Sequence, residues 1–258
     1  MDAGTNPGAA ADGGERMNSA LSWLFDPAHW SGAEGFPARI LEHLGYTALT
    51  VLVAAAIAVP LGAIVGHTGR GTFLVAGLSN WLRALPELGL LTLLVLLTYV
   101  GLLPVVVSLV ILAVPPVLAG TYAGVRNVDP SVVDAARGMG MRESHVLWRV
   151  ELPNALPLIL GGIRSATLQV IATATIAAYV SLGGLGRFVI DGNNSGAGSP
   201  DGYPQMAAGA IMIAVLALVV EGVLELVQRL AVSPGLRNAT TRKRTARIWR
   251  RPTPDLVK

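Results

Sequence analysis

The stretch Leu88–Val125, LGLLTLLVLLTYVGLLPVVVSLVILAVPPVLAGTYAGV, contains no charged side chain. A membrane-spanning helix needs roughly 20 apolar residues, so this stretch is too long for one span, and Gly101 with Pro104 favours a turn inside it. Charge is also absent from three further runs, residues 44–66, 165–186 and 202–220. Over the whole chain 14% of residues are charged, against about 25% in soluble domains. The sequence therefore predicts an all-α, polytopic membrane protein.

Polar and charged segments divide the apolar sequence into about five spans. The first two spans are separated by the tight polar loop His67–Gly71, and the last two by Gly183–Pro204, which is rich in Gly, Asn, Ser and Pro. Pro86 is expected to kink the second span, because a proline removes one helix hydrogen bond. The predicted spans are Leu44–Gly66, Thr72–Tyr99, Pro104–Tyr122, Leu156–Ser181 and Gln205–Leu226.

The two ends of the chain differ from its apolar centre. The first 17 residues are rich in Gly, Ala and Asp and are expected to be disordered. Leu21–Trp30 is short, aromatic and interrupted by Asp26-Pro27, which favours a segment lying in the membrane interface. The predicted divisions are a disordered N-terminus (1–17), an interfacial segment (18–40), a transmembrane domain (41–230) and a basic cytoplasmic tail (231–258).

Arginine and lysine are unevenly distributed between the two predicted sides of the membrane. Such residues are enriched in cytoplasmic loops close to membrane helices. With five spans, the first loop, the segment 125–155 and the C-terminus share a side, which we predict to be the cytoplasm, with the N-terminus on the outer side of the membrane. The basic residues between Arg242 and Arg251 form a cluster in the tail, which is expected to lie near anionic lipid rather than to bind nucleic acid. The basic residues on this side are Arg70, Arg126, Arg137, Arg142, Arg149, Arg242, Lys243, Arg244, Arg247, Arg250 and Arg251.

The segment 125–155 is long for a connection between two spans and is expected to be folded. A helix is expected to begin near Asp129 or Ser131, because a proline at 130 suits the first helical position. Gly138 and Gly140 are expected to end it. The pattern predicts a helix-turn-helix at the cytoplasmic face.

The second helix of this pair has an apolar and a charged face and is expected to end at Leu152-Pro153, before Pro157 opens the next span. In the first helix, Ala135 and Ala136 are small residues expected to be exposed, so that a partner surface can approach closely. The alternative is an ordinary amphipathic loop that packs only on its own helices.

The spacing of seven residues in this segment resembles the cytoplasmic loop of permease subunits of ABC importers. That loop has the pattern Glu-Ala-Ala, three residues, Gly, nine residues, Ile, one residue, Leu-Pro. This chain has Asp in place of Glu and Val in place of Ile, and every spacing matches. By resemblance, the loop is a coupling helix between spans 3 and 4 that docks on a separate ATP-hydrolysing subunit. The matching residues are Asp134, Ala135, Ala136, Gly140, Val150, Leu152 and Pro153.

A longer match, over about residues 40–228, resembles the glycine betaine, choline and carnitine osmoprotectant importers. The resemblance implies a cargo of quaternary ammonium compatible solutes, and the sequence departs from it at Glu87, where small polar residues are usual. The similar stretches are Leu85-Pro86, Val128–Met141, Val150–Pro153, Ala155–Pro157, Gly162–Arg164, Ala172–Thr175 and Gly183–Gly186.

The resemblance also implies partners. We expect two copies of an ATP-binding subunit, a second permease copy or a sister permease, an extracellular substrate-binding protein and the lipid membrane, which the resemblance implies is a bacterial plasma membrane. ATP and Mg²⁺ are expected to be used by the partner subunit, with no cofactor in this chain.

Enzymatic chemistry is not predicted for this chain. A phosphate-binding P-loop needs a lysine after a glycine, and the only lysines, Lys243 and Lys258, follow other residues. The chain has no cysteine, which excludes disulfides and thiol catalysis. The four histidines lack metal-ligand spacing, so no metal site is expected.

Polar residues within the spans are candidates for a translocation path. Arg83 and Glu87 are four residues apart beside Pro86, and charges within a span favour a pathway role. The alternative is a salt bridge on the surface of a tilted helix. Gln169, Thr173, Thr175 and Tyr179 of span 4 are further candidates, although polar side chains also hold membrane helices together.

Three other functions stay open at this point. The first is an ABC importer permease for another small polar solute, such as an amino acid or a sulfonate. The second is an ion-coupled carrier or a channel that works without a partner ATPase. The third is a membrane scaffold without transport activity, which the ordered pattern of the segment 125–155 disfavours.

Overall fold

The structure, a computed structural model, describes residues 7–196 and 199–232, and these are almost entirely helical. The predicted basic tail therefore lies outside the described residues from 233 onward. The elements in chain order are α1 (Pro7–Leu24), η1 (Pro27–Trp30), α2 (Phe36–Thr68), α3 (Thr72–Arg83), α4 (Glu87–Leu97), α5 (Leu102–Arg126), α6 (Pro130–Gly138), α7 (Glu143–Val146), η2 (Leu147–Glu151), α8 (Leu152–Thr173), η3 (Ala174–Val180), α9 (Gly186–Asn194) and α10 (Gly202–Ala231).

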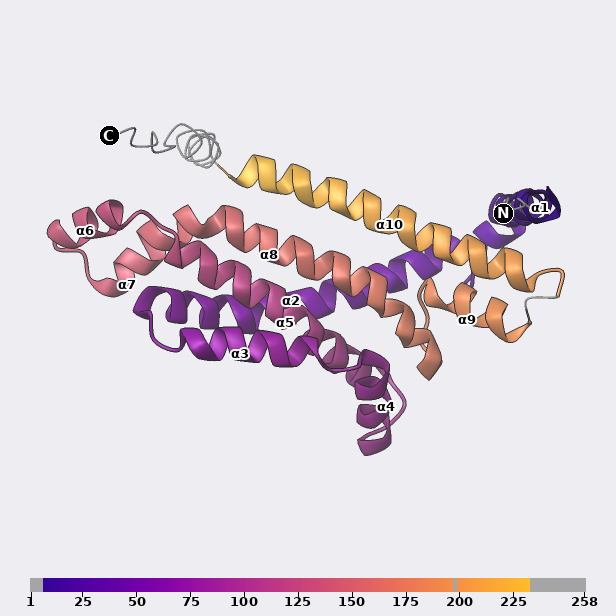
Figure 1. Ribbon diagram of the computed structural model, residues 1–258, viewed down its shortest axis with the longest axis horizontal. Coiled ribbons are helices and arrows are strands. Elements are labelled where there is room, and N and C mark those ends of the chain that lie inside the picture. Colours follow the sequence, from indigo (N-terminus) through magenta and orange to yellow (C-terminus); the bar gives the residue numbers. More distant parts are fainter. Residues whose placement is uncertain (1–6, 197–198, 233–258) are drawn as a thin grey trace, which may run out of the picture.

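Helices α2, α5 and α8 form the centre of an elongated bundle, and α10 lies along α8 (Figure 1). The main core between these helices contains Ala54, Leu109, Val117 and Val170, all fully buried. A second cluster joins the beginning of α2 to α1, α9 and α10 through rings such as Phe36 and Phe188. The bundle therefore has two ends, one carrying α6 and α7 and the other carrying α1 and α9 (Figure 1).

Glycines allow the central helices to lie very close together. A Cβ atom added to Gly120 of α5 would lie 2.8 Å from Cα of Gly162 of α8, and one added to Gly62 of α2 would lie 3.0 Å from the Leu118 carbonyl oxygen. Small residues permit this approach of helix backbones in membranes, where packing rather than water exclusion holds helices together.

Four helical segments are long and apolar enough to cross a membrane, as judged from the described residues: Phe36–Thr68, Leu102–Arg126, Glu143–Val180 and Gly202–Ala231. They cover four of the five predicted spans, apart from Ser181 at the end of the fourth predicted span, and each extends beyond its predicted span by several residues on at least one side. The long, apolar, uncharged runs in the sequence were therefore sufficient to predict these four segments.

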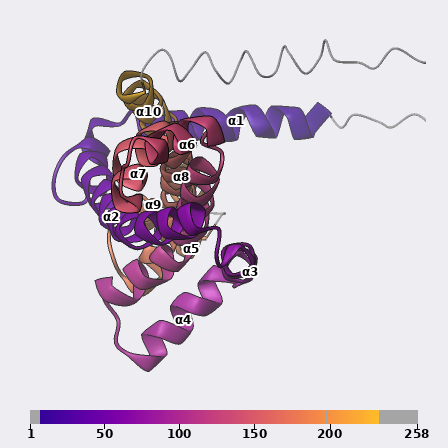
Figure 2. The ribbon, with the colours of Figure 1, turned by 90° about the vertical axis from the view of Figure 1, so that its left-hand side faces the viewer.

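The second predicted span is not a single kinked helix, so this expectation was wrong. It consists of α3 and the shorter apolar helix α4, and the chain is not helical between them. Pro86 has an extended backbone (φ −72°, ψ 115°) and directly precedes α4, which then points away from α3 (Figures 1 and 2). A proline ring disfavours helical geometry in the preceding residue as well as removing a donor, so the helix stops rather than bends.

The predicted disordered N-terminus and the predicted loop 183–204 are partly helical, and so is the interfacial segment between the N-terminus and the first span. Residues 7–17, expected to be disordered, belong to α1, which packs against α10. The predicted interfacial segment 18–40 contains the end of α1, η1 and the beginning of α2. The predicted loop 183–204 contains α9, whose Phe188 is buried against α1 and α2. Packing at this end of the bundle stabilises helices that composition alone did not indicate.

Candidate coupling segment and translocation path

The first helix of the predicted coupling segment begins and ends where the sequence indicated. Asp129 caps α6, and its carboxylate accepts hydrogen bonds from the Ser131 backbone N–H (3.0 Å) and hydroxyl (2.8 Å). Pro130 takes the first helical position, where its missing N–H costs nothing. The helix ends at Gly138, and Gly140 has a left-handed backbone with φ of 78°. A glycine adopts that conformation without steric cost.

Helix α6 has one buried face and one exposed face. Val133 and Ala136 pack against Val146 of α7, and Ala136 is 2% exposed. The expectation that both alanines are exposed was therefore wrong for Ala136, which fills the space between α6 and α7. Ala135 is exposed. The exposed residues of this part of the segment include Val132, Asp134, Ala135, Met139 and Gly140.

The second helix of the segment does not end at Leu152-Pro153, contrary to the sequence-based expectation. The chain continues without interruption from α7 through η2 into α8. In η2 the turn is widened, and the Leu152 N–H donates to the Leu147 carbonyl, five residues back. A π-type turn just before Pro153 accommodates a proline that would otherwise clash with the preceding turn. The second part of the segment, α7 and η2, thereby forms one continuous rod with α8.

The remaining residues of the predicted coupling motif lie on this rod. Val150 is half-buried against α6 and α7, and Leu152 is half-buried against the cluster around Ala155 and Ile159. Pro153 is exposed. The motif therefore combines an exposed surface on α6 with the residues that pack α6 onto the beginning of α8.

A polar network that the sequence did not indicate joins this segment to the end of α2. Nδ1 of His67 lies 2.6 Å from a carboxylate oxygen of Glu151, and its Nε2 lies 3.3 Å from Glu143. Glu143 also accepts two hydrogen bonds of 3.0 Å from the Arg137 guanidinium. Arg137 lies in the last turn of α6, so the network runs from α6 to α2. The hydrogen bonds from Arg137 hold the pKa of the Glu143 carboxyl below its usual range.

The predicted path residues of span 4 lie on α8 and η3. The Thr173 hydroxyl donates to the Gln169 carbonyl (2.8 Å), and the Thr175 hydroxyl donates to the Ala172 carbonyl (3.2 Å). The hydroxyl donors of both threonines are thus satisfied within their own helical segments. Tyr179 is 62% exposed. The structure therefore leaves a transport role for these residues as a prediction.

Arg83 and Glu87 do not share a helix. Arg83 is the last residue of α3, and Glu87 is the first residue of α4. The side chain of Arg83 lies outside the described part of the structure. One carboxylate oxygen of Glu87 is buried and has no hydrogen-bond partner among the described residues. The salt bridge considered from the sequence assumed that both residues share one helix, and the structure breaks the helix between them.

Charged residues between α8 and α10 were not recognised from the sequence as a contact. Nε of Arg164 donates to Glu221 at 2.7 Å, and its Nη2 lies 3.7 Å from Glu225. Arg164 and Glu221 are charged residues in otherwise apolar spans and lie at similar depths. This pattern could have indicated their contact. The contact fastens the fifth span to the fourth.

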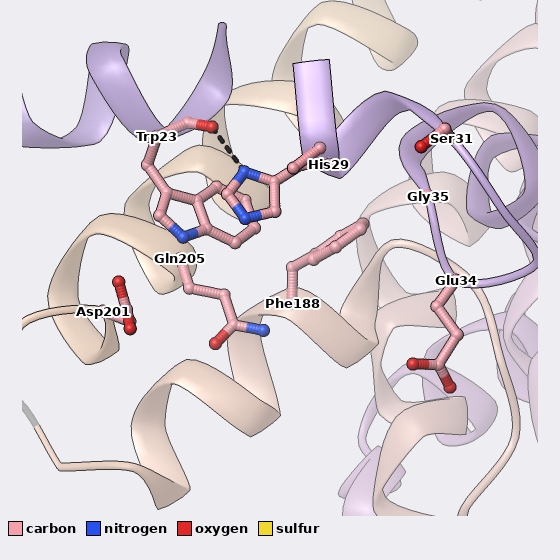
Figure 3. Close-up of a pocket in the computed structure, with 9 residues that line it drawn as sticks. Trp23, His29, Ser31, Glu34, Gly35, Phe188, Asp201 and Gln205 are labelled. Atoms are coloured by element: carbon pink, nitrogen blue, oxygen red, sulfur yellow. Dashed lines mark hydrogen bonds between the residues drawn. The ribbon is translucent and has the colours of Figure 1, made fainter. Parts of the chain in front are cut away.

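A pocket of about 370 Å³ lies at the other end of the bundle (Figure 3). The Trp23 and His29 rings stack at 3.6 Å, and Nδ1 of His29 donates to the Trp23 carbonyl at 2.8 Å. Phe188, Asp201 and Gln205 line the opposite side. The lining comes from α1, η1, the turn before α2, α9 and the start of α10, whereas the predicted path residues lie on α3, α4, α8 and η3.

Comparison with known proteins gives consistent matches to membrane transport subunits. A carnitine transport permease protein of Listeria monocytogenes is 36% identical over 180 residues, covering 70% of this chain and 80% of that protein. A choline transport system permease protein of Bacillus subtilis is 32% identical over 199 residues, covering 77% of this chain and 89% of that protein.

Solved structures agree with the fold. The chain superposes on the MetNI methionine ABC transporter in an inward-facing conformation with a TM-score of 0.65, at 19% identity, covering 75% of this chain and 94% of the other. It superposes on an amino acid ABC transporter with a TM-score of 0.60, at 22% identity, covering 75% of this chain and 92% of the other.

The family profile described as binding-protein-dependent transport system inner membrane component matches residues 58–232. This range contains the coupling motif, the network at His67 and the three helices α5, α8 and α10. The chain belongs to the family of inner membrane permease components of binding-protein-dependent ABC importers.

Proposed function

We propose that this permease imports quaternary ammonium compatible solutes, such as glycine betaine, choline or carnitine. The observation that carries the proposal is the identity of 36% and 32% to relatives named for carnitine and choline transport, over 70% or more of the chain. A further relative, at 32% over 196 residues, is named for glycine betaine, carnitine and choline together. These names come from sequence relatives that are more similar than the amino acid transporters found by structure.

The energy for transport comes from a separate ATP-binding subunit, in two copies, which uses ATP and Mg²⁺. The exposed surface of α6, around Asp134, Ala135 and Met139, is the proposed docking surface. Because α6 packs on α7 through Val133, Ala136 and Val146, and α7, η2 and α8 form one continuous rod, a displacement of α6 is carried into α8. A second permease copy or a sister permease completes the pathway, and an extracellular binding protein delivers the cargo.

The proposed orientation places α6 and α7 in the cytoplasm and the N-terminus outside. Five basic residues of the described chain support it: Arg70, Arg126, Arg137, Arg142 and Arg149. They lie in the loop after α2 or from the end of α5 to η2, at the end of the bundle that carries α6 (Figure 1). The positive-inside tendency assigns that end to the cytoplasm.

The translocation path is proposed to involve the break between α3 and α4 together with α8 and η3. Glu87 supports this assignment, since a buried carboxylate oxygen without a described partner is costly unless it acts on a ligand or is paired in the assembly. The remaining proposed residues are Arg83, Gln169, Thr173, Thr175 and Tyr179.

The test is uptake into proteoliposomes that contain the permease, its ATP-binding subunit and its binding protein, with ATP inside. We expect ATP-dependent uptake of radiolabelled glycine betaine, choline or carnitine, with competition among them and none from methionine. The control is a complex whose ATP-binding subunit lacks its phosphate-binding lysine. ATP-dependent uptake of an amino acid alone would replace the proposed cargo, and uptake independent of ATP would support a stand-alone carrier.

A further inference from the structure

The imidazole of His67 lies between two carboxylates that belong to the coupling segment. Its Nδ1 lies 2.6 Å from Glu151, whose side chain is 7% exposed, and its Nε2 lies 3.3 Å from Glu143, whose side chain is 58% exposed. His67 itself is the penultimate residue of α2. Two segments that are 76 or more residues apart in sequence thus meet at one ring.

The two carboxylates contact the His67 ring in different ways. Nδ1 of His67 shares a hydrogen bond of 2.6 Å with Glu151, whereas Glu143 lies near Nε2 and already accepts two hydrogen bonds from Arg137. The buried Glu151 carboxylate depends on His67 most, because a buried polar group that loses its hydrogen-bond partner is costly.

The place of His67 in the fold gives this contact a mechanical consequence. The coupling segment is joined through the chain to α5 on one side and to α8 on the other. Helix α2 has no such covalent connection to it, and the His67 network provides a direct polar link (Figure 2 views this end of the bundle). Arg137 extends the link into α6 through its two hydrogen bonds to Glu143.

We propose that His67 is a positioning residue that ties the coupling segment to the cytoplasmic end of α2. A displacement of docked α6 then moves α2 together with α8, so that two of the central helices respond as a unit. This inference rests on the proposed function, since it needs an ATP-driven displacement of α6. It assigns a role to a residue outside the coupling motif.

Charged groups from the neighbouring elements surround this link. The groups facing His67 are Glu143 from α7 and Glu151 from η2, with Arg137 of α6 behind Glu143 and Arg126 of α5 beside the turn that follows α2.

The experiment compares His67→Gln with His145→Gln in the full complex in proteoliposomes. His145 is an exposed histidine of α7, so it controls for loss of a histidine in the same segment. We measure ATP-dependent glycine betaine uptake per ATP hydrolysed. For His67→Gln we expect this ratio to fall at least about fivefold, the lower end of coupling between linked sites. His145→Gln should match the wild type.

A second measurement reports the link without cargo. The chain has no cysteine, so cysteines introduced at the exposed positions Thr68 and Ser144 carry the only spin labels on the permease. In the wild type, the distribution of distances between these two labels should stay narrow when ATP binds to the complex. In His67→Gln it should broaden or shift on ATP binding, while size-exclusion chromatography shows an intact complex.

The possible failures are distinguishable. Absence of ATP-dependent uptake in the wild-type complex would contradict the proposed function. Wild-type uptake, together with an unchanged coupling ratio and unchanged label distances in His67→Gln, would overturn the role of His67 while leaving the proposed function in place.

Discussion

Gly162→Ala places a methyl group where α5 and α8 lie closest together. The added Cβ would lie 2.7 Å from the Pro116 carbonyl oxygen and 3.2 Å from Cα of Gly120. Both neighbours are backbone atoms, which cannot move aside as a flexible side chain can, so the two helices must separate. Gly161→Ala is a matched control, because a Cβ at the adjacent position of the same helix meets nothing within 4 Å.

The comparison isolates the cost of this contact. Each substitution gains helix propensity of about 1 kcal/mol, and this gain cancels between the two variants. Overpacking a well-packed core costs about 1–3 kcal/mol, so we expect Gly162→Ala to be less stable than Gly161→Ala by that amount. SDS titration of the purified permease in detergent micelles, followed by loss of helical circular dichroism, measures the difference. Equal unfolding midpoints for the two variants would refute the close packing of α5 against α8.

The remaining predictions concern the coupling segment. Asp129→Ala removes the cap of α6 and should lower stability by about 0.5–2 kcal/mol, measured by the same titration, whereas an unchanged midpoint would contradict the capping contact. Ala135→Trp should leave the fold intact but abolish transport with ATP hydrolysis retained, while Ala136→Trp should impair folding because that site is buried; the reverse pattern would contradict the assigned faces. The lowered pKa of Glu143 stabilises the fold above the pKa of the unfolded state, and this contribution is lost as pH falls through the lower folded value. Unfolding midpoints of the wild type and Glu143→Gln should therefore converge in acid, and a constant gap across pH would argue against the Arg137 pair.

Apolar run length was enough to predict four of the long membrane helices, because the membrane requires uninterrupted apolar sequence of a known length. The second span shows where that argument stops. Run length does not distinguish one kinked helix from two helices, and the local geometry at Pro86 separates α3 from α4. Leu152-Pro153 is a second proline whose effect run length does not predict. Here the helix does not break, because a π-type turn lets it continue through the proline.

The coupling motif shows which part of a site is visible in sequence. Local rules for caps and glycines predicted the bounds of α6 correctly, from Asp129 to Gly140. The partners of His67 were not visible, because Glu151 lies 84 positions later and becomes a neighbour only when α2 packs beside η2. Burial of Ala136 likewise depends on the position of α7. Long-range packing, rather than local propensity, decides both.

The central claim is that this permease receives its energy through α6 from a partner ATPase. A single cysteine at Met139, which is 76% exposed on the coupling segment, tests it in a chain without other cysteines. The control is a single cysteine at exposed Ser195, directly after α9 at the opposite end of the bundle (Figure 1). With a short thiol-to-amine crosslinker in membranes that contain the whole complex, Met139→Cys should form a covalent adduct with the ATP-binding subunit, and Ser195→Cys should form none. Absence of the Met139→Cys adduct, or an equal yield from Ser195→Cys, would contradict the claim.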